Sequence, residues 1–298
     1  MKARFSAPAK VNLILRVVGQ RPDGYHLLQT VMTFFPLFDF LEFERLDADS
    51  GIYLACQPEV TASPEENLAC KGAKALQMAA GTDKGVRIHL IKNIPHGGGL
   101  GGGSSDAATV LLALNQLWNL NWTRDQLIEL GVGLGADVPI FLGGEAALAE
   151  GVGERLSFLP RLPTAVLVLL NPGLNISTAE VFSRLAGRFP LHSHPLTPAS
   201  VMAGEVVALL ENDLEPVVRQ MTPVIAEMAA ALKSTGAVAT LMSGSGASLF
   251  GVFQGEKQAD QAVTILKERY SSWKVSKGQT FNIHPFANEM KSGIVRGL

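Results

Sequence analysis

The pattern of hydrophobic and polar positions near the amino terminus predicts an antiparallel layer of strands. Val11, Leu13 and Leu15 alternate with polar residues, which places Lys10 and Asn12 on the same face of one strand. Further strands are predicted at 30–35, 38–44 and 52–56. A lysine at the start of a strand is more often exposed than functional, so this pattern alone leaves the role of Lys10 open.

Helical spacing of apolar residues begins after residue 60. Ser63-Pro64-Glu65-Glu66 predicts a helix start with Ser63 as N-cap, and this helix extends to about residue 80. A strand over 86–90 precedes a glycine-rich segment, and a helix follows in which Ser104 or Ser105 is the expected N-cap. Thr123-Arg124-Asp125-Gln126 reads as a capping box that opens another helix.

Pro160 and Pro163 separate a predicted hairpin from the second half of the chain, and we place a domain boundary there. The predicted domains are therefore 1–159 and 160–298. Leaving out extra helices, the second domain has the order βαββαβ, the split βαβ arrangement of ferredoxin-like domains. Its strands are predicted at 165–170, 237–242, 248–253 and 273–277, and its helices are predicted as a short one with Phe182, two near 198–210 and 214–233, and one over 256–270.

Composition narrows the classes of partner. The chain has 298 residues with 47% hydrophobic content, enough for two sizeable cores, and its net charge of −2 gives no basic surface for nucleic acid. Cys56 and Cys70 form no disulfide or metal pattern, and no export signal or membrane-spanning run is found. We therefore expect a cytoplasmic protein without a membrane partner. His192-Ser193-His194 is more typical of a surface loop than of a metal site.

The stretch from Pro95 to Asp106 is the most informative segment, because six glycines in seven positions allow the backbone to approach a ligand closely. A glycine loop between a strand and a helix directs unpaired N–H groups at one point, which favours a bound phosphate. The P-loop pattern fails because Ser104 stands where a lysine is required. A dinucleotide fingerprint matches only weakly, and no acidic residue follows at the end of a second strand.

Three other places are candidates for chemistry. Asp137 is the single charge in the run 131–144, so it is either a helix cap or the partner of a cation or ligand, and Lys10 is one such cation. Tyr25 and His26 follow a turn, where they suit a ligand ring or simply cover a sheet edge. The segment 242–248 is a second Gly/Ser loop, which is either a hairpin turn or a set of phosphate-binding donors.

Together these motifs resemble a known superfamily. The loop at 95–105 is similar to the P-x-G-x-G-L-G-S-S loop of the galactokinase, homoserine kinase, mevalonate kinase and phosphomevalonate kinase (GHMP kinase) superfamily. The extra glycines and the segments 8–13, 21–26, 135–139 and 243–246 look like the branch that phosphorylates a cytidylated methylerythritol in non-mevalonate isoprenoid biosynthesis. The resemblance implies a two-domain α+β fold, with an N-terminal nucleotide domain like ribosomal protein S5 domain 2 and a C-terminal ferredoxin-like domain.

The resemblance also implies roles for particular residues. Asp137 would accept or orient the proton of the substrate hydroxyl, and Lys10 would steady both groups. ATP would contact the loop residues Pro95, His96, Gly97, Gly98, Gly99, Leu100, Gly101, Gly102, Gly103, Ser104 and Ser105, with Asn67 and Lys92 facing adenine. The cytidylated small molecule would contact Asn12, Tyr25, His26 and Phe182, and the second loop comprises Ser243, Gly244, Ser245 and Gly246.

The implied reaction is phosphorylation of the 2-hydroxyl of the methylerythritol moiety by ATP. Mg²⁺ is expected with ATP, but the sequence identifies no protein ligands for it, and it predicts no oligomeric state. The alternatives are homoserine or mevalonate kinase, a Rossmann dehydrogenase, and a nucleotide-binding module without catalysis. Tyr25 and His26 argue against the first two kinases, whose substrates carry no base, and the combination of Lys10 with Asp137 argues against binding alone.

Overall fold

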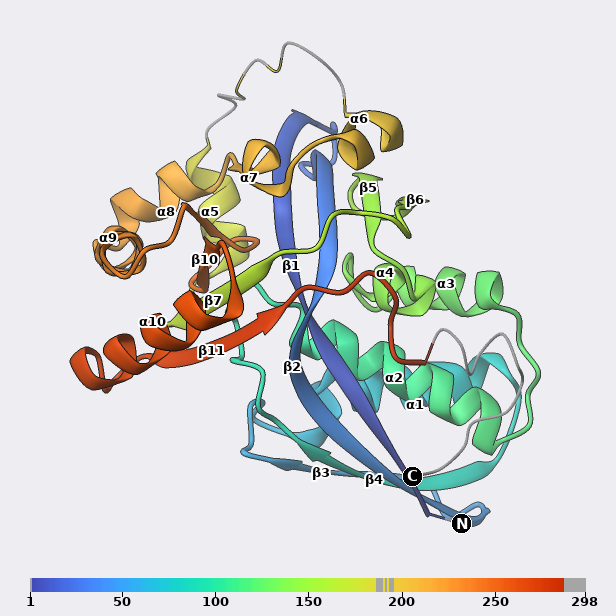
Figure 1. Cartoon of the computed structure of the whole chain (residues 1–298). Helices are drawn as coiled ribbons and strands as arrows, with labels where there is room; N and C mark the ends of the chain where they lie inside the picture. Colours follow the sequence, from blue (N-terminus) through green and yellow to red (C-terminus); the bar gives the residue numbers. More distant parts are fainter. Residues whose placement is uncertain (1, 186–189, 191, 193–195, 287–298) are drawn as a thin grey trace.

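Two β-sheets form the frame of the molecule in the computed structural model, which describes residues 2–185, 190, 192 and 196–286. The larger sheet has the order β3-β4-β2-β1-β8, with β5 paired to β2 and β6 to β5, and the smaller one has the order β11-β7-β10-β9. In Figure 1 the long strands β1 and β2 cross the molecule from one end to the other, and helices cover one side of each sheet.

The larger sheet is built on a long antiparallel hairpin. Its strands are β1 (Lys2–Gln20), β2 (His26–Ala48), β3 (Ile52–Gln57), β4 (Lys84–Ile91), β5 (Ala147–Gly151), β6 (Arg155–Phe158) and β8 (Glu211–Asn212). The two strands predicted at 30–35 and 38–44 are one continuous strand. The predicted antiparallel layer is wrong for β3, which runs parallel to β4, because a helical crossover separates these two strands in the chain.

The helices of the first half are η1 (Pro64–Glu66), α1 (Leu68–Ala79), α2 (Gly102–Leu117), α3 (Arg124–Val132) and α4 (Val138–Gly143). Ser63 makes no capping hydrogen bond, and Asn67 caps α1 instead by accepting from the Ala69 N–H at 2.9 Å. Neither Ser104 nor Ser105 caps α2, because that helix already begins after Gly101. The capping box at Thr123 is confirmed.

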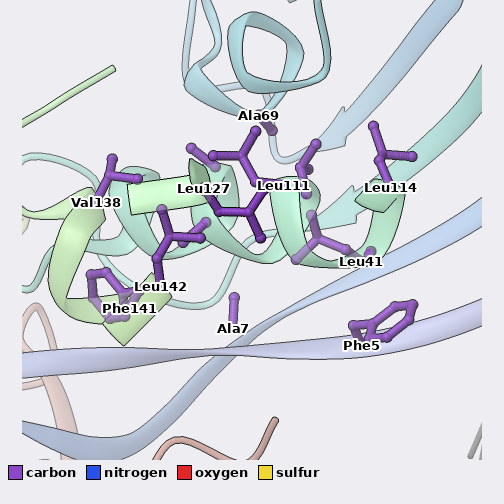
Figure 2. Packing of buried hydrophobic residues seen from close by; sticks show 14 of the residues in the cluster. Phe5, Ala7, Leu41, Ala69, Leu111, Leu114, Leu127, Val138, Phe141 and Leu142 are labelled. Carbon is purple, nitrogen blue, oxygen red and sulfur yellow. The ribbon is translucent and has the colours of Figure 1, made fainter. Parts of the chain in front are cut away.

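The largest hydrophobic core lies between the larger sheet and its helices. Figure 2 shows α2 above the long strands, with α3 and α4 beside it and side chains from all of them pointing into one layer. Among the labelled residues are Phe5, Ala7, Leu41, Leu111, Leu114, Leu127, Val138, Phe141 and Leu142. The apolar positions that predicted helical spacing along α2 are thus the ones that fix this helix, and with it the glycine loop, on the sheet.

The second half contains the predicted βαββαβ order. Its strands β7 (Val166–Asn171), β9 (Ala239–Met242), β10 (Leu249–Phe253) and β11 (Lys274–Gln279) form an all-antiparallel sheet, with α9 (Val224–Ser234) and α10 (Glu256–Arg269) packed against it. The other helices are α5 (Thr178–Arg184), α6 (Pro198–Ala203), α7 (Val206–Leu209) and α8 (Glu215–Met221). The two long helices predicted over 198–210 and 214–233 are each two helices, because Gly204 ends α6 and Pro223 interrupts α8 and α9.

Segments beyond residue 160 also complete the larger sheet. β8 pairs in parallel with β1, and Phe281 and Ile283 form bridges with Phe34 and Glu145. The division into 1–159 and 160–298 stays a prediction. Among the described residues, no helix is both long and apolar enough to cross a lipid bilayer.

Leu111 provides a test of this core. Leu111→Ala removes a fully buried side chain, so we expect the free energy of unfolding to fall by about 2–5 kcal/mol through lost burial and the cavity left behind. Urea unfolding followed by circular dichroism measures the change. Met78→Ala is the control, because Met78 is 82% exposed and its loss should change stability by less than about 0.5 kcal/mol. Equal stabilities of the two variants would contradict the packing.

Candidate active site

A cleft of about 470 Å³ lies where β1, β2, the glycine loop, the start of α4, the start of α5 and the second Gly/Ser loop meet. It is lined by Lys10, Asn12, Lys92, residues 95–104, Asp137, Phe182, Gly244 and Ser245 among the residues predicted from sequence. The structure therefore brings together side chains from distant parts of the chain. Tyr25, His26, Asn67, Ser105, Ser243 and Gly246 are outside the lining of the cleft.

Lys10 and Asp137 form an ion pair in this cleft. The Lys10 side chain is buried, and its Nζ lies 3.2 Å from Asp137 Oδ2 and donates to Asn12 Oδ1 at 2.7 Å. Asp137 precedes α4 without making a side-chain capping hydrogen bond, so its carboxylate is not used as a cap. The backbone N–H of Lys10 donates to the Leu100 carbonyl at 2.9 Å, which ties β1 to the glycine loop.

A side chain at either of two positions in the glycine loop would crowd neighbouring atoms, which favours glycine there. Gly101 has φ +68° and precedes α2, and a Cβ there would lie 3.0 Å from Lys10 Cγ. At Gly99 a Cβ would overlap the carbonyl oxygen of Ser243. The first N–H groups of α2, a helix of 16 residues, open on the same cleft, where they and the positive end of the helix dipole favour an anion. Ser104 faces this cleft, whereas Ser105 is fully buried.

The second Gly/Ser loop is a hairpin turn between β9 and β10 and also part of the site. Ser243 Oγ donates to the Gly99 carbonyl at 2.9 Å and accepts from the Asn12 N–H at 3.2 Å. Asn212 holds the turn from behind, because its Nδ2 donates to the Met242 carbonyl at 2.7 Å and to the Gly244 carbonyl at 2.9 Å. No local pattern predicts this role for Asn212, because the role depends on a contact between distant segments.

Aromatic rings gather at the other end of the cleft. The rings of His26 and Phe182 are stacked, with centroids 4.8 Å apart and an interplanar angle of 27°. Partial burial lowers the pKa of His26, which favours the neutral imidazole with one donor and one acceptor nitrogen. Tyr25 is 66% exposed on the adjoining turn. The three residues that the resemblance assigned to a base therefore lie near one another, with Phe182 in the cleft wall.

Lys92 is paired with two acidic residues that no local pattern in the sequence predicts as its partners. Its ammonium is buried between the carboxylates of Asp39 and Asp106, at 2.6 Å from Asp106 Oδ2. Burial opposes the charge on Lys92, but the two carboxylates outweigh it and raise the pKa of this lysine. Burial also raises the pKa of Asp106 to about 7, with Lys92 acting in the opposite direction and Asp39 in the same one. A lone Asp39 between Phe38 and Phe40 was the available signal, since a carboxylate on a buried strand needs a cation.

Asn67 has a structural task as the cap of α1 and is 4% exposed. Contact of Asn67 or Lys92 with adenine, and of Ser105 with phosphate, stays a prediction.

Two features elsewhere are structural. His192 lies between two carboxylates, with Nδ1 3.2 Å from Glu211 Oε1 and Nε2 3.0 Å from Asp213 Oδ2. These three residues are near enough to one another to hold a metal ion, but the two carboxylates face different ring nitrogens, which suits polar contacts of the ring with each carboxylate better. Ser193 and His194 of the same motif lie outside the described residues.

A separate hollow of about 410 Å³ on the larger sheet is lined by charged side chains that pair with each other, including Arg87 and Glu44 at 2.6 Å.

Comparisons with known proteins bear on the whole chain. Residues 67–145 match the GHMP kinases N terminal domain and residues 202–272 the GHMP kinases C terminal domain. The chain is 43% identical to a 4-diphosphocytidyl-2-C-methyl-D-erythritol kinase of Geobacter sp. (strain M21), over 91% of this chain and 96% of the relative. It is 46% identical to the kinase of the same name from Nitrosomonas eutropha, over 90% of this chain and 94% of the relative.

Solved structures agree with these relatives. A crystal structure of 4-(cytidine 5'-diphospho)-2C-methyl-D-erythritol kinase superimposes with a TM-score of 0.79 at 38% identity, covering 93% of this chain and 99% of the other. A homoserine kinase from Cytophaga hutchinsonii shares the fold, with a TM-score of 0.69 at 17% identity over 95% of this chain and 96% of the other.

A glycine loop precedes a helix beside a paired lysine and aspartate, and the two halves of the α+β fold match the two GHMP domains. These features define the class of the protein, a small-molecule kinase of the GHMP superfamily. Within that superfamily the chain belongs to the family of 4-diphosphocytidyl-2-C-methyl-D-erythritol kinases.

The buried cluster around Lys92 generates a prediction about stability. Because the pKa of Asp106 is about 7 in the folded state and 3.8 in its reference state, the folded protein retains a proton that the unfolded chain releases between these values. The free energy of unfolding therefore falls as pH rises through this window. Asp106→Asn removes that titration, and we expect the variant to lose roughly 2 kcal/mol less stability than the wild type between pH 5 and 7.5.

Urea unfolding at several pH values measures these slopes. Asp49→Asn is the matched control, because Asp49 is exposed and its substitution should leave the wild-type slope unchanged. Parallel curves for wild type and Asp106→Asn would show that Asp106 does not hold the proton.

Proposed function

We propose that this protein transfers the γ-phosphoryl group of ATP to the 2-hydroxyl of 4-diphosphocytidyl-2-C-methyl-D-erythritol, giving the 2-phosphate and ADP, in non-mevalonate isoprenoid biosynthesis. The observation that carries the proposal is the ion pair between the buried Lys10 and the partly exposed Asp137, which lies beside the glycine loop in one cleft. Relatives that align over more than 90% of this chain are named as kinases of the same cytidylated methylerythritol. The cytoplasm is the proposed location.

The chemistry assigns a task to each wall of the cleft. The N–H groups of the glycine loop and of the start of α2 bind the phosphates of ATP, without a lysine from the loop itself. Asp137 accepts the proton of the attacking substrate hydroxyl. The oxygen of that hydroxyl forms a bond to the γ-phosphorus, while the bond between this phosphorus and the oxygen of the departing ADP breaks. Lys10 stabilises the negative charge on Asp137 and on the incoming oxygen.

Mg²⁺ would fit the cleft mainly as an ion bound to the phosphates of ATP, with few ligands from the protein. Among the described residues that line the cleft, Asp137 is the one with a carboxylate, and Ser104 adds a hydroxyl. Mg²⁺ keeps several waters and binds readily through one carboxylate and substrate phosphates, so this sparse donor set suits it. When bound, the ion would neutralise phosphate charge.

The aromatic end of the cleft supports a substrate that carries a base. Phe182, stacked on His26, offers a ring face to cytosine, and the neutral imidazole of His26 is a hydrogen-bonding group suited to its polar edge. Homoserine and mevalonate have no ring to place there. The cytidylated acceptor is therefore favoured over these two alternatives.

ADP release by the purified protein tests the reaction. We expect turnover with ATP and the cytidylated methylerythritol and none above background with homoserine or mevalonate. Asp137→Ala should reduce kcat by at least about 1,000-fold, because it removes the proton acceptor and leaves Lys10 without its carboxylate. Preference for homoserine or mevalonate would refute the substrate, and an Asp137→Ala variant with wild-type activity would refute the role of that carboxylate.

Recognition of the base is tested separately. Phe182→Ala should raise the KM for the cytidylated substrate by about 3- to 10-fold, the expected value of one aromatic contact, and leave the KM for ATP within about twofold. Tyr25→Ala should likewise raise the KM for the cytidylated substrate and leave the KM for ATP nearly unchanged. Tyr53→Ala is the control, because Tyr53 is a 55% exposed aromatic residue on β3, away from the cleft. Equal increases in both KM values would argue against stacking.

A further inference from the structure

Thr30, a residue of β2 in the wall of the cleft, forms hydrogen bonds that reach the Lys10 ammonium through Asn12. Its side chain is buried, and its Oγ1 donates to the Ile14 carbonyl at 2.7 Å. A hydroxyl has one hydrogen, so Oγ1 can only accept from any other neighbour. It accepts from Asn12 Nδ2 at 2.8 Å. The Ile14 carbonyl therefore determines which way the hydroxyl points, and the hydroxyl determines which end of the Asn12 amide faces it.

The other end of that amide faces the ion pair. Asn12 Oδ1 accepts from Lys10 Nζ at 2.7 Å, and the same nitrogen lies 3.2 Å from Asp137 Oδ2. If the amide were turned over, Asn12 Nδ2 and Lys10 Nζ, both donors, would face each other, and Lys10 would lose the amide acceptor and retain Asp137. Ser243 Oγ lies 3.4 Å from Asn12 Oδ1, but its hydrogen has a shorter contact with the Gly99 carbonyl at 2.9 Å, so Ser243 does not replace Thr30 in this task.

We propose that Thr30 is a positioning residue for phosphoryl transfer, because its hydroxyl fixes the Asn12 amide in the orientation that holds the Lys10 ammonium beside Asp137. The inference rests on the proposed function for the step that Lys10 and Asp137 perform. Thr30 itself need not touch either substrate. Its place in the fold also explains the local geometry, since the β1–β2 ladder shifts register between Asn12 and Ile14, where the hydroxyl takes the Ile14 carbonyl.

Thr30→Val tests this role, because it keeps the shape of the side chain and removes both hydrogen bonds. We expect kcat to fall by about tenfold while the KM for ATP stays within about twofold, since the variant loosens Lys10 and leaves the glycine loop intact. Thr30→Ser should restore most of the rate, because it returns the hydroxyl. In an Asn12→Ala background, Thr30→Val should cost no further rate, because the residue it orients is gone.

Thr33→Val is the matched control on the same strand. Thr33 is also fully buried, and its hydroxyl donates to the Phe281 carbonyl at 2.9 Å, so the substitution removes a comparable hydrogen bond away from the cleft. Its kcat should stay within about twofold of the wild type, even where its melting temperature falls as much as that of Thr30→Val. Wild-type kcat in Thr30→Val, or equal losses in Thr30→Val and Thr33→Val, would overturn the proposal, as would full additivity with Asn12→Ala.

A measurement independent of turnover separates this inference from the proposed reaction. In protein labelled with ¹⁵N-asparagine, the Asn12 side-chain signal is assigned by its loss in Asn12→Ala. Its amide protons should exchange with solvent at least about tenfold faster in Thr30→Val than in the wild type or in Thr33→Val. If the wild type does not phosphorylate the cytidylated acceptor, the proposed reaction fails, and unchanged exchange in Thr30→Val would show that Thr30 does not orient Asn12.

Discussion

The burial of the Lys10 ammonium is the constraint on which the site depends. An ammonium removed from water is destabilising by several kcal/mol unless charges and acceptors surround it. Its own strand supplies only the Asn12 amide, so the carboxylate has to come from Asp137, at a distant position in the chain. Satisfying one cation therefore fixes β1 against α4. Because Lys10 also bonds to Leu100 and packs on Gly101, the same requirement places the glycine loop beside the ion pair.

The positive charges of two buried lysines in the same cleft, Lys10 and Lys92, are neutralised by different partners. We infer different roles for the two lysines from this difference. Lys92 lies between the carboxyl groups of Asp39 and Asp106 and contributes to holding β2, β4 and α2 together. Lys10 has one carboxylate and a neutral amide, so an anion entering the cleft meets a cation with fewer acidic partners than Lys92 has. Negative charge that develops on a reacting oxygen is thus stabilised better near Lys10 than near Lys92.

Local signals allowed much of the fold and site to be predicted. The split βαβ order, the capping box at Thr123, the shared face of Lys10 and Asn12, and the pairing of Lys10 with Asp137 all agree with the structure. Each depends on periodicity, on a cap, or on a lone charge in an apolar run. The start of α2 and the split helices of the second half were wrong, because helix ends depend on tertiary packing as much as on capping residues. Thr30, Asp106 and Asn212 could not be found, since each acts through a partner far away in the sequence.

The long β1–β2 hairpin sets the spacing within the proposed site. His26 begins β2 at the aromatic end, and Thr30 lies four residues further along, next to the polar group of Asn12 and Lys10. At about 3.3 Å per residue, these two positions on a regular strand are ~13 Å apart. A single strand therefore holds the proposed base-binding end and the proposed phosphoryl-acceptor end at a fixed separation. In the proposed reaction the diphosphate of the substrate spans this separation, so an acceptor without a nucleotide could occupy only one end of the cleft.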